Sequence, residues 1–300
     1  MHNAVLSSDQ IDHFIQNGWV RLEEAIKRAD ALAVQDYLWE HVEKRGVLKA
    51  DKSTWTQPMV HIKEAYSDGP FQNCQTERLT NAILDLVGEG RWSEQGKEVT
   101  WGWWPVNFSQ GADEPWTVPV HGWHWDGIHF RHYIDAPDQG LLLLPMFSDT
   151  IPHGGATVIA EGSHKLTARY LNSKPEGVEL GAGIQGCIAE NLWLQQLVGK
   201  APLPEGENRV SYFMDKYTTD ENGTRLKVVE AVANAGDVYM CHPFLFHAAA
   251  QNHSKTPRFM CNRTVKLTQR LHIHDDSTDL SPLEISVRAA LEAGGQAVAV

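Results

Sequence analysis

A histidine and an aspartate, His124 and Asp126, lie two residues apart in the segment Val-His-Gly-Trp-His-Trp-Asp-Gly that covers residues 120–127. Side chains at this spacing point to the same face of a strand. Joined by a second imidazole from elsewhere, they would form the facial triad that holds iron(II) and leaves positions open for a cosubstrate and dioxygen. The spacing alone is a weak signal, because a chain with 15 histidines produces it by chance and most such residues lie on the surface or in the core.

A second segment, residues 236–258, offers the missing ligand. It begins Gly-Asp-Val-Tyr-Met-Cys, runs on to His247, and passes a polar turn with Asn252 before a proline and Arg258. The pattern is that of a turn leading into an apolar strand that ends in histidine, followed by a second turn and the start of the next strand.

These residues resemble the phytanoyl-CoA dioxygenase (PhyH) family of iron(II)- and 2-oxoglutarate-dependent oxygenases, in which Gly-Asp, a strand, histidine, a short turn with Asn and Ser, and Pro-Arg recur in this order. The resemblance implies that His247 completes the triad and that Arg258 binds the distal carboxylate of 2-oxoglutarate. Arginine suits that task, because its planar guanidinium pairs bidentately with a carboxylate and keeps its proton.

Two further blocks carry the resemblance. Residues 147–165 contain an aspartate in a turn, a glycine pair and a Gly-Ser-His-Lys ending, and residues 7–22 read as a helix followed by Gly-Trp-Val. The four ordered blocks fall between residues 6 and 268. They imply Fe(II), 2-oxoglutarate as cosubstrate and O2, with hydroxylation of a small molecule and release of succinate.

Asp126 bears on the outcome of the reaction. Related halogenases replace this carboxylate with a small residue that leaves room for halide, whereas here the carboxylate is present. Hydroxylation is therefore the default, and desaturation, epoxidation or ring formation stay open on the same oxidant.

The chain also departs from the family pattern. Members commonly carry a serine two residues after the second ligand histidine, where it supports the cosubstrate carboxylate, but here that position is Ala249. Another group must supply this hydrogen bond, or Arg258 acts alone. The segment between Asp126 and His247 is also longer than usual, so we do not predict a fatty acyl-CoA substrate.

Several neighbouring histidines compete with these assignments. His121 lies three residues before His124 and therefore points to the opposite face of a strand, so we interpret it as structural. His242 competes with His247, but the following proline and the spacing to Arg258 favour His247 as the ligand.

Two residues are weaker candidates for contact with 2-oxoglutarate. His61 falls where the family often places a polar residue that touches the cosubstrate, and Asn107 follows a tryptophan-rich strand that leads toward the metal. Each residue is explained equally well as an ordinary, partly buried side chain without contact with the cosubstrate. Six tryptophans precede or lie within the metal segment, and they indicate either an aromatic substrate pocket or core packing: Trp101, Trp103, Trp104, Trp116, Trp123 and Trp125.

Two other functions fit part of the pattern. A redox-silent metal cupin, such as an isomerase or lyase, could use the same three ligands, but it has no need of Arg258. A non-catalytic member of the fold that binds a small molecule has no chemical use for all four residues.

Around these residues the sequence predicts one domain, residues 1–300, of mainly β structure with helices (α+β): a double-stranded β-helix, the cupin-like jelly roll. We expect mainly helical support in 1–98, with a short strand over 19–22, a jelly-roll core in 99–165 and 233–268, a helical insertion that could serve as a lid in 166–232, and a C-terminal helix over 281–293. The core strands are predicted near 99–108, 118–124, 139–147, 156–160, 236–241, 244–249 and 258–267.

Composition limits the partners. The net charge of −12 disfavours nucleic acid and anionic membranes. The N-terminus lacks the features of an export signal and the longest apolar run is too short for a bilayer, so we expect a cytoplasmic protein acting on a small molecule. The four cysteines show no Cys-x-x-Cys pairing and are expected to be core residues. The sequence does not indicate an oligomeric state.

Overall fold

The computed structural model describes residues 4–273 and 277–295. Its helices are α1 Ser8–Asn17, α2 Arg28–Glu43, α3 Glu77–Val87, α4 Ser163–Asn172, α5 Leu180–Ala189, α6 Leu192–Leu197, α7 Arg209–Phe213 and α8 Pro282–Ala293, with short 3-10 turns η1 Lys52–Thr54 and η2 Gly69–Asn73. Its strands are β1 Trp19–Leu22, β2 Met59–Tyr66, β3 Trp101–Asn107, β4 Leu141–Pro145, β5 Thr157–Glu161, β6 Thr218–Thr219, β7 Arg225–Glu230, β8 Val238–Cys241, β9 His247–Ala249 and β10 Arg263–Val265.

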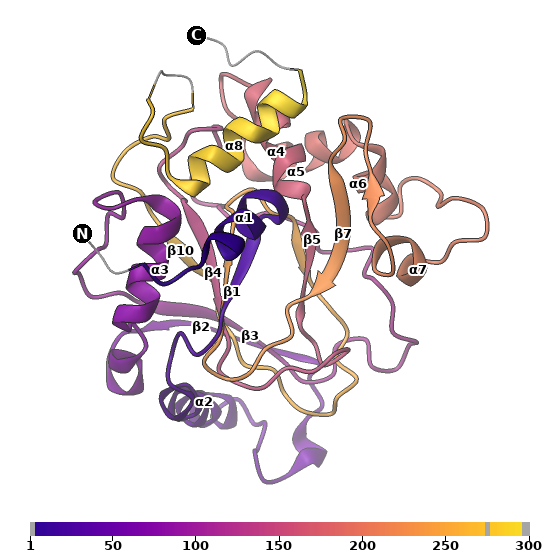
Figure 1. Ribbon diagram of the computed structural model, residues 1–300. Coiled ribbons are helices and arrows are strands. Elements are labelled where there is room, and N and C mark those ends of the chain that lie inside the picture. Colours follow the sequence, from indigo (N-terminus) through magenta and orange to yellow (C-terminus); the bar gives the residue numbers. More distant parts are fainter. Residues whose placement is uncertain (1–3, 274–276, 296–300) are drawn as a thin grey trace.

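One antiparallel sheet has the strand order β1-β8-β4-β10. The antiparallel pair β2-β3 adjoins this sheet through isolated bridges, in which Gly102 pairs with Asn262 and Asn107 with Arg258. The opposite sheet has the order β6-β7-β5-β9. Figure 1 shows β1, β4 and β10 on one side of the molecule and β5 and β7 on the other. This arrangement confirms the predicted jelly roll.

Two hydrophobic clusters follow from the alternation of side chains along the strands. The smaller cluster lies between the sheets and joins Leu142 and Leu144 of β4 to Ile159 of β5. The larger one covers the outer faces, where Leu143 of β4 and Val158 of β5 share a core with the helices. Polar side chains that share the inner face of the strands are therefore held in a narrow space between two packed layers.

The N-terminal segment begins with a well-formed helix end. Ser7 caps α1 and exchanges hydrogen bonds with Gln10, and Gly18 ends the helix in the left-handed conformation (φ 85°). A Cβ atom at Gly18 would lie 2.4 Å from Nδ1 of His164, so the close approach to α4 also requires glycine. The chain then enters β1, which pairs with β8 as an edge strand.

Most of the predicted elements are confirmed within a few residues, including α1, β1, α2, α3 and α8. The predicted strand over 118–124 was wrong, because only His124 makes an isolated bridge there. Two strands were not predicted: β2, which lies within the mainly helical range, and β7, which lies within 166–232 and pairs with β5. Both depend on long-range pairing, which local patterns do not reveal.

No helix among the described residues is both long and apolar enough to cross a membrane. All four cysteines are buried and free, as expected of core residues.

Candidate metal and cosubstrate site

Two chain segments that are far apart in the sequence meet at His124 and His247. Each backbone N–H donates to the carbonyl of the other residue, with N–O distances of 3.1 and 2.9 Å, and the ring centroids lie 4.4 Å apart. His247 begins β9, whereas His124 has only this one bridge to hold it. The pairing therefore aligns the two imidazoles without a full strand at residues 118–124.

The side chains of His124, Asp126 and His247 converge so that their ligand atoms all lie within 4.8 Å of one another. Oδ1 of Asp126 is 3.2 Å from Nε2 of His124 and 3.8 Å from Nε2 of His247. Nδ1 of His124 lies 2.6 Å from the Gly122 carbonyl, and Nδ1 of His247 lies 3.1 Å from the Leu245 carbonyl. In the neutral rings Nδ1–H donates to these carbonyls, which leaves both Nε2 lone pairs for a metal.

Electrostatics favour a carboxylate and a neutral imidazole at this point. Burial alone would raise the pKa of Asp126, but the hydrogen bonds and charges of His124, His247 and Asn262 outweigh it and lower the pKa to about 2. Burial lowers the pKa of His247 to about 4, and its buried Nε2 has no hydrogen-bond partner. Burial also lowers the pKa of His124, but the neighbouring Asp126 carboxylate raises it by more. The donor set suits a divalent metal of the iron type.

Asn262 is a part of the site that the sequence did not reveal. Its Nδ2 donates to Oδ2 of Asp126 at 2.9 Å, so Oδ1 is left to face the histidines. Asn262 follows Arg258 by four residues, and side chains four apart share a face of an extended chain. That alternation was the one available signal, but nothing in the sequence linked it to Asp126.

Arg258 is buried, with 2% of its surface exposed, and its Nε and Nη1 have no hydrogen-bond partner. No described residue forms an ion pair with it. Burial lowers its pKa to about 10, so it remains protonated at neutral pH. A buried, unpaired guanidinium is costly, and an incoming carboxylate offers the partner that it lacks.

Asn107 and His61 have different surroundings. Asn107 is fully buried beside Arg258, but its Nδ2 donates to the Ala250 carbonyl at 2.9 Å and its Oδ1 accepts from the Gln110 N–H at 3.1 Å. Its side chain thus braces the backbone around the site. His61 is exposed on β2, and its ring lies 5.5 Å from that of Trp103. The role in cosubstrate binding suggested for each stays a prediction.

The competing histidines lie elsewhere. His121 is exposed. His242 is buried between Phe14 and His164, at centroid distances of 6.0 and 4.9 Å, and is not part of the metal-ligand cluster. Four of the six tryptophans are buried, as core packing predicts. Trp103 is 47% exposed, and Trp116 stacks on His153.

The model of the phytanoyl-CoA dioxygenase (PhyH) family matches residues 16–260, which is most of the chain. The protein belongs to this family. Its members are iron- and 2-oxoglutarate-dependent oxygenases, and the match includes His124, Asp126, His247 and Arg258. A comparison with curated proteins gives no match.

Among solved structures, the chain is similar to the non-heme α-ketoglutarate-dependent carbocyclase SnoK from nogalamycin biosynthesis, with 14% identity, coverage of 89% of this chain and 87% of that chain, and a TM-score of 0.48. It is also similar to EctD from S. alaskensis with 2-oxoglutarate and 5-hydroxyectoine, with 13% identity, coverage of 87% of this chain and 76% of that chain, and a TM-score of 0.46. A third similar structure is HygX from Streptomyces hygroscopicus with nickel and 2-oxoglutarate bound, with 14% identity, coverage of 93% of this chain and 94% of that chain, and a TM-score of 0.46.

Proposed function

We propose that this protein is an Fe(II)/2-oxoglutarate-dependent dioxygenase that hydroxylates a small molecule and converts 2-oxoglutarate to succinate. The observation that carries the proposal is the pairing of two features. The ligand atoms of three residues lie close together, and a buried Arg258, between β9 and β10, has no ion-pair partner among the described residues.

Each residue has a stated task. His124, Asp126 and His247 would hold the metal, which when bound supplies the site at which dioxygen is activated. Arg258 would pair with the distal carboxylate of 2-oxoglutarate and fix its orientation, while the two packed layers limit the access of water. Asn262 would keep Oδ1 of Asp126 directed at the metal through its hydrogen bond to Oδ2.

Thr157 is suited to replace the serine that the family places at the position of Ala249. Thr157 and Ala249 are cross-strand partners, just as Ile159 is the partner of His247. Cross-strand partners share one face and have Cβ atoms about 5 Å apart. The hydroxyl of Thr157 therefore stands beside the missing one, on the face that also carries His247, and we propose that it supports the cosubstrate carboxylate.

The alternatives differ in their use of Arg258. A redox-silent cupin would use the same three ligands and leave a buried cation without a function. Hydroxylation is proposed as the default and halogenation is disfavoured, because the carboxylate of Asp126 occupies the position that a halide would need; desaturation, epoxidation and ring formation use the same oxidant and stay open. We further propose a cytoplasmic location and a lid role for part of residues 166–232.

The test is an anaerobic mixture of apoprotein, Fe(II) and 2-oxoglutarate. We expect a weak visible charge-transfer band that is absent in Asp126→Ala and much weaker in Arg258→Ala. Arg270→Ala is the matched control, because its guanidinium is exposed and pairs with Asp135 at the surface. Its band should equal that of the native protein.

Absence of a band at saturating Fe(II) and 2-oxoglutarate would refute the cosubstrate assignment. A band of equal strength in Arg258→Ala would refute the assigned role of the arginine. Succinate release against a panel of metabolites then identifies the substrate.

A further inference from the structure

A cleft of about 470 Å³ lies on the molecule between η2, α3 and the segment that precedes β3. Its lining includes Phe71, Gln75, Thr80 and Trp92, together with the oppositely charged Lys97 and Glu98. None of these residues belongs to the metal and cosubstrate site.

Arg263 lies directly behind this wall. It is 5% exposed, its Nη1 donates to Oε1 of Gln75, and its guanidinium carbon lies 5.6 Å from the ring centroid of Trp92 and 4.8 Å from that of Trp101. Its Nη2 is buried and has no hydrogen-bond partner. No described residue forms an ion pair with it, and Glu94 is the carboxylate whose charge acts on it from a distance.

A second unpaired donor belongs to a lining residue of the cleft. The indole Nε1 of Trp92 is buried without a hydrogen-bond partner. Buried donors are nearly always paired, since leaving one unpaired costs free energy and leaving a buried cation without a counter-charge costs more. Gln75 connects Arg263 to Thr80, whose hydroxyl accepts from Nε2 of Gln75 at 2.9 Å. The wall of the cleft thus offers an indole N–H, an amide and a hydroxyl, with the cation of Arg263 directly behind it.

We propose that this cleft is a second ligand site, which takes a small anion bearing a carboxylate or phosphate group. The anion pairs with Arg263 and accepts a hydrogen bond from Trp92, while Gln75 turns to admit it. Asn262, the residue before Arg263, donates to the metal-binding carboxylate of Asp126, so neighbouring residues serve the two sites on opposite faces of one extended segment.

The test measures anion binding by calorimetry on protein that is free of metal and of 2-oxoglutarate, because 2-oxoglutarate is itself a small carboxylate anion and would compete for the cleft. The protein is titrated separately with inorganic phosphate and citrate. We expect saturable binding of at least one probe, and the tighter of the two identifies the chemical class. The same constant in Arg258→Gln protein places the binding outside the cosubstrate site.

Single-residue variants show whether the anion binds in this cleft. Arg263→Gln should weaken binding by about tenfold or more, because a charged hydrogen-bond donor is lost. Trp92→Phe keeps the ring and should weaken binding by about threefold, which decides the matter if Arg263→Gln does not fold. Glu94→Gln should strengthen binding, because a competing carboxylate is removed. The control Arg270→Gln, an equal change of charge at the surface, should bind as the native protein does.

Two results would overturn the proposal. One is the absence of saturable binding of both probes to the native protein. The other is binding that is unchanged in folded Arg263→Gln and in Trp92→Phe.

Discussion

At the scale of single residues, the metal site depends on hydrogen bonds that fix which atom of each ligand is available. The carbonyls of Gly122 and Leu245 hold Nδ1 of the two histidines, and Asn262 holds one oxygen of Asp126. Each ligand therefore has one atom engaged with the protein and one atom directed to the shared position. Such supporting contacts usually matter for metal affinity nearly as much as the ligands do.

Asn262→Ala tests this support. The variant leaves Oδ2 of Asp126 without its amide partner, so the carboxylate can rotate, and we expect Fe(II) to bind about tenfold more weakly or worse. Anaerobic Fe(II) titration gives the constant. Asn73→Ala is the matched control, since it removes an exposed hydrogen bond from Asn73 to Asp30 (3.0 Å) and should leave Fe(II) affinity unchanged.

Thr157→Val tests the proposed replacement for the family's serine. Valine keeps the shape of threonine and removes the hydroxyl, so the apparent affinity for 2-oxoglutarate should fall by about threefold while Fe(II) affinity holds. The charge-transfer band measures both titrations. Thr157→Ser restores the hydroxyl and should bind 2-oxoglutarate as the native protein does. Equal weakening in the serine variant would assign the effect to packing instead.

The metal ligands could be predicted from the sequence, but the residues that support them could not. His124 and Asp126 were singled out by their spacing, which was a weak signal until the resemblance to the family implied His247 as the third ligand, and the structure gathers all three. The partners of Asn262 and Thr157 lie more than 85 residues away in the sequence, so no local pattern identifies these two residues. For Asn107 the structure shows an amide bonded to the Ala250 carbonyl, and its contact with the cosubstrate stays a prediction.

At the scale of elements, one arginine ties the predicted insertion to the segment that carries the metal ligands. Arg209 of α7 donates to the carbonyls of Val118 and Pro119 at 2.7 and 2.8 Å, and to carbonyls at the end of α6. Burial lowers its pKa to about 10, so it stays charged at neutral pH. Within residues 118–124 only His124 makes a β-bridge, to His247, and the first part of the segment is held by Arg209 together with the hydrogen bond from Nε1 of Trp123 to the Pro119 carbonyl (2.8 Å).

Arg209→Met should loosen that segment. Methionine fills much of the volume but donates no hydrogen bonds, so we expect a loss of about 2 kcal/mol in the free energy of unfolding and faster amide hydrogen exchange within residues 118–124. Urea unfolding and exchange mass spectrometry measure the two effects. Arg78→Met is the control, because Arg78 is exposed and makes a long contact (3.3 Å) with the Glu23 carbonyl. Unchanged exchange in Arg209→Met would show that the segment is held by other contacts.

The two strands that were not predicted, β2 and β7, were missed for the same physical reason. β2 contains Lys63 and Glu64, and β7 contains Lys227, so neither shows a continuous apolar run. Both become strands because a distant partner, β3 or β5, provides the hydrogen bonds and covers one face. Helices such as α1 and α8 were predicted closely because their caps and apolar spacing are local.

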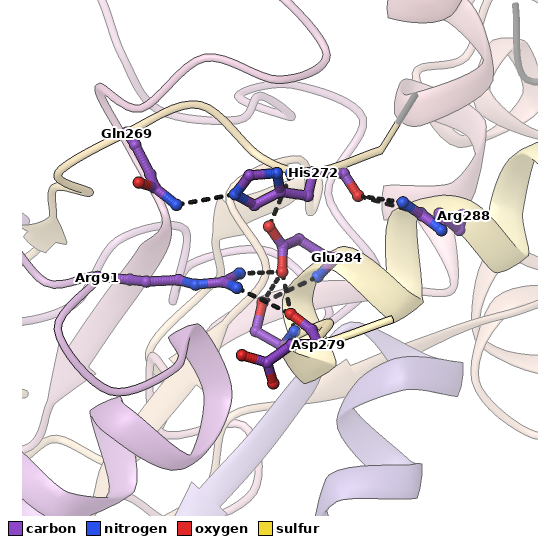
Figure 2. A network of polar contacts seen from close by, with 7 residues as sticks. Arg91, Gln269, His272, Asp279, Glu284 and Arg288 are labelled. Atoms are coloured by element: carbon purple, nitrogen blue, oxygen red, sulfur yellow. Dashed lines mark hydrogen bonds and ion pairs between the residues drawn. The ribbon is translucent and has the colours of Figure 1, made fainter. Parts of the chain in front are cut away.

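At the scale of the whole molecule, a polar network joins the C-terminal helix to the residues that follow α3. Figure 2 shows Arg91 and the backbone N–H of His272 directed at the carboxylate of Glu284, to which both donate hydrogen bonds. Ser281, which caps α8, donates to the same carboxylate through its hydroxyl at 2.8 Å. Arg91 also donates to the Asp279 carbonyl at 2.9 Å. Glu284 is 1% exposed, so the first turn of α8 is fixed by a buried charge.

Glu284→Gln should make the stability less dependent on pH. Burial raises the pKa of Glu284, but the hydrogen bonds from His272 and Ser281 and the charge of Arg91 outweigh it and lower the pKa below the usual value. A lowered folded-state pKa stabilises the fold above the unfolded-state pKa of about 4.3, and that contribution disappears as the pH falls through the folded-state pKa. The variant should therefore lose about 2 kcal/mol at neutral pH and little in acid.

Urea unfolding over a range from about pH 7 to about pH 3 measures this difference. Glu292→Gln, at an exposed position of the same helix, is the control and should follow the native curve. A constant difference between Glu284→Gln and the native protein at all pH values would contradict the assignment.

The bridge between His124 and His247 has a consequence for the handling of a redox-active metal. Because the two imidazoles come from distant segments and are aligned by mutual backbone hydrogen bonds, an unfolded chain offers no such chelate. A metal held only by the folded state stabilises that state by mass action, and unfolding releases the metal. Iron retention and native structure are thus coupled in one equilibrium, so thermal denaturation at rising Fe(II) concentration should report the occupancy of the site without any knowledge of the substrate.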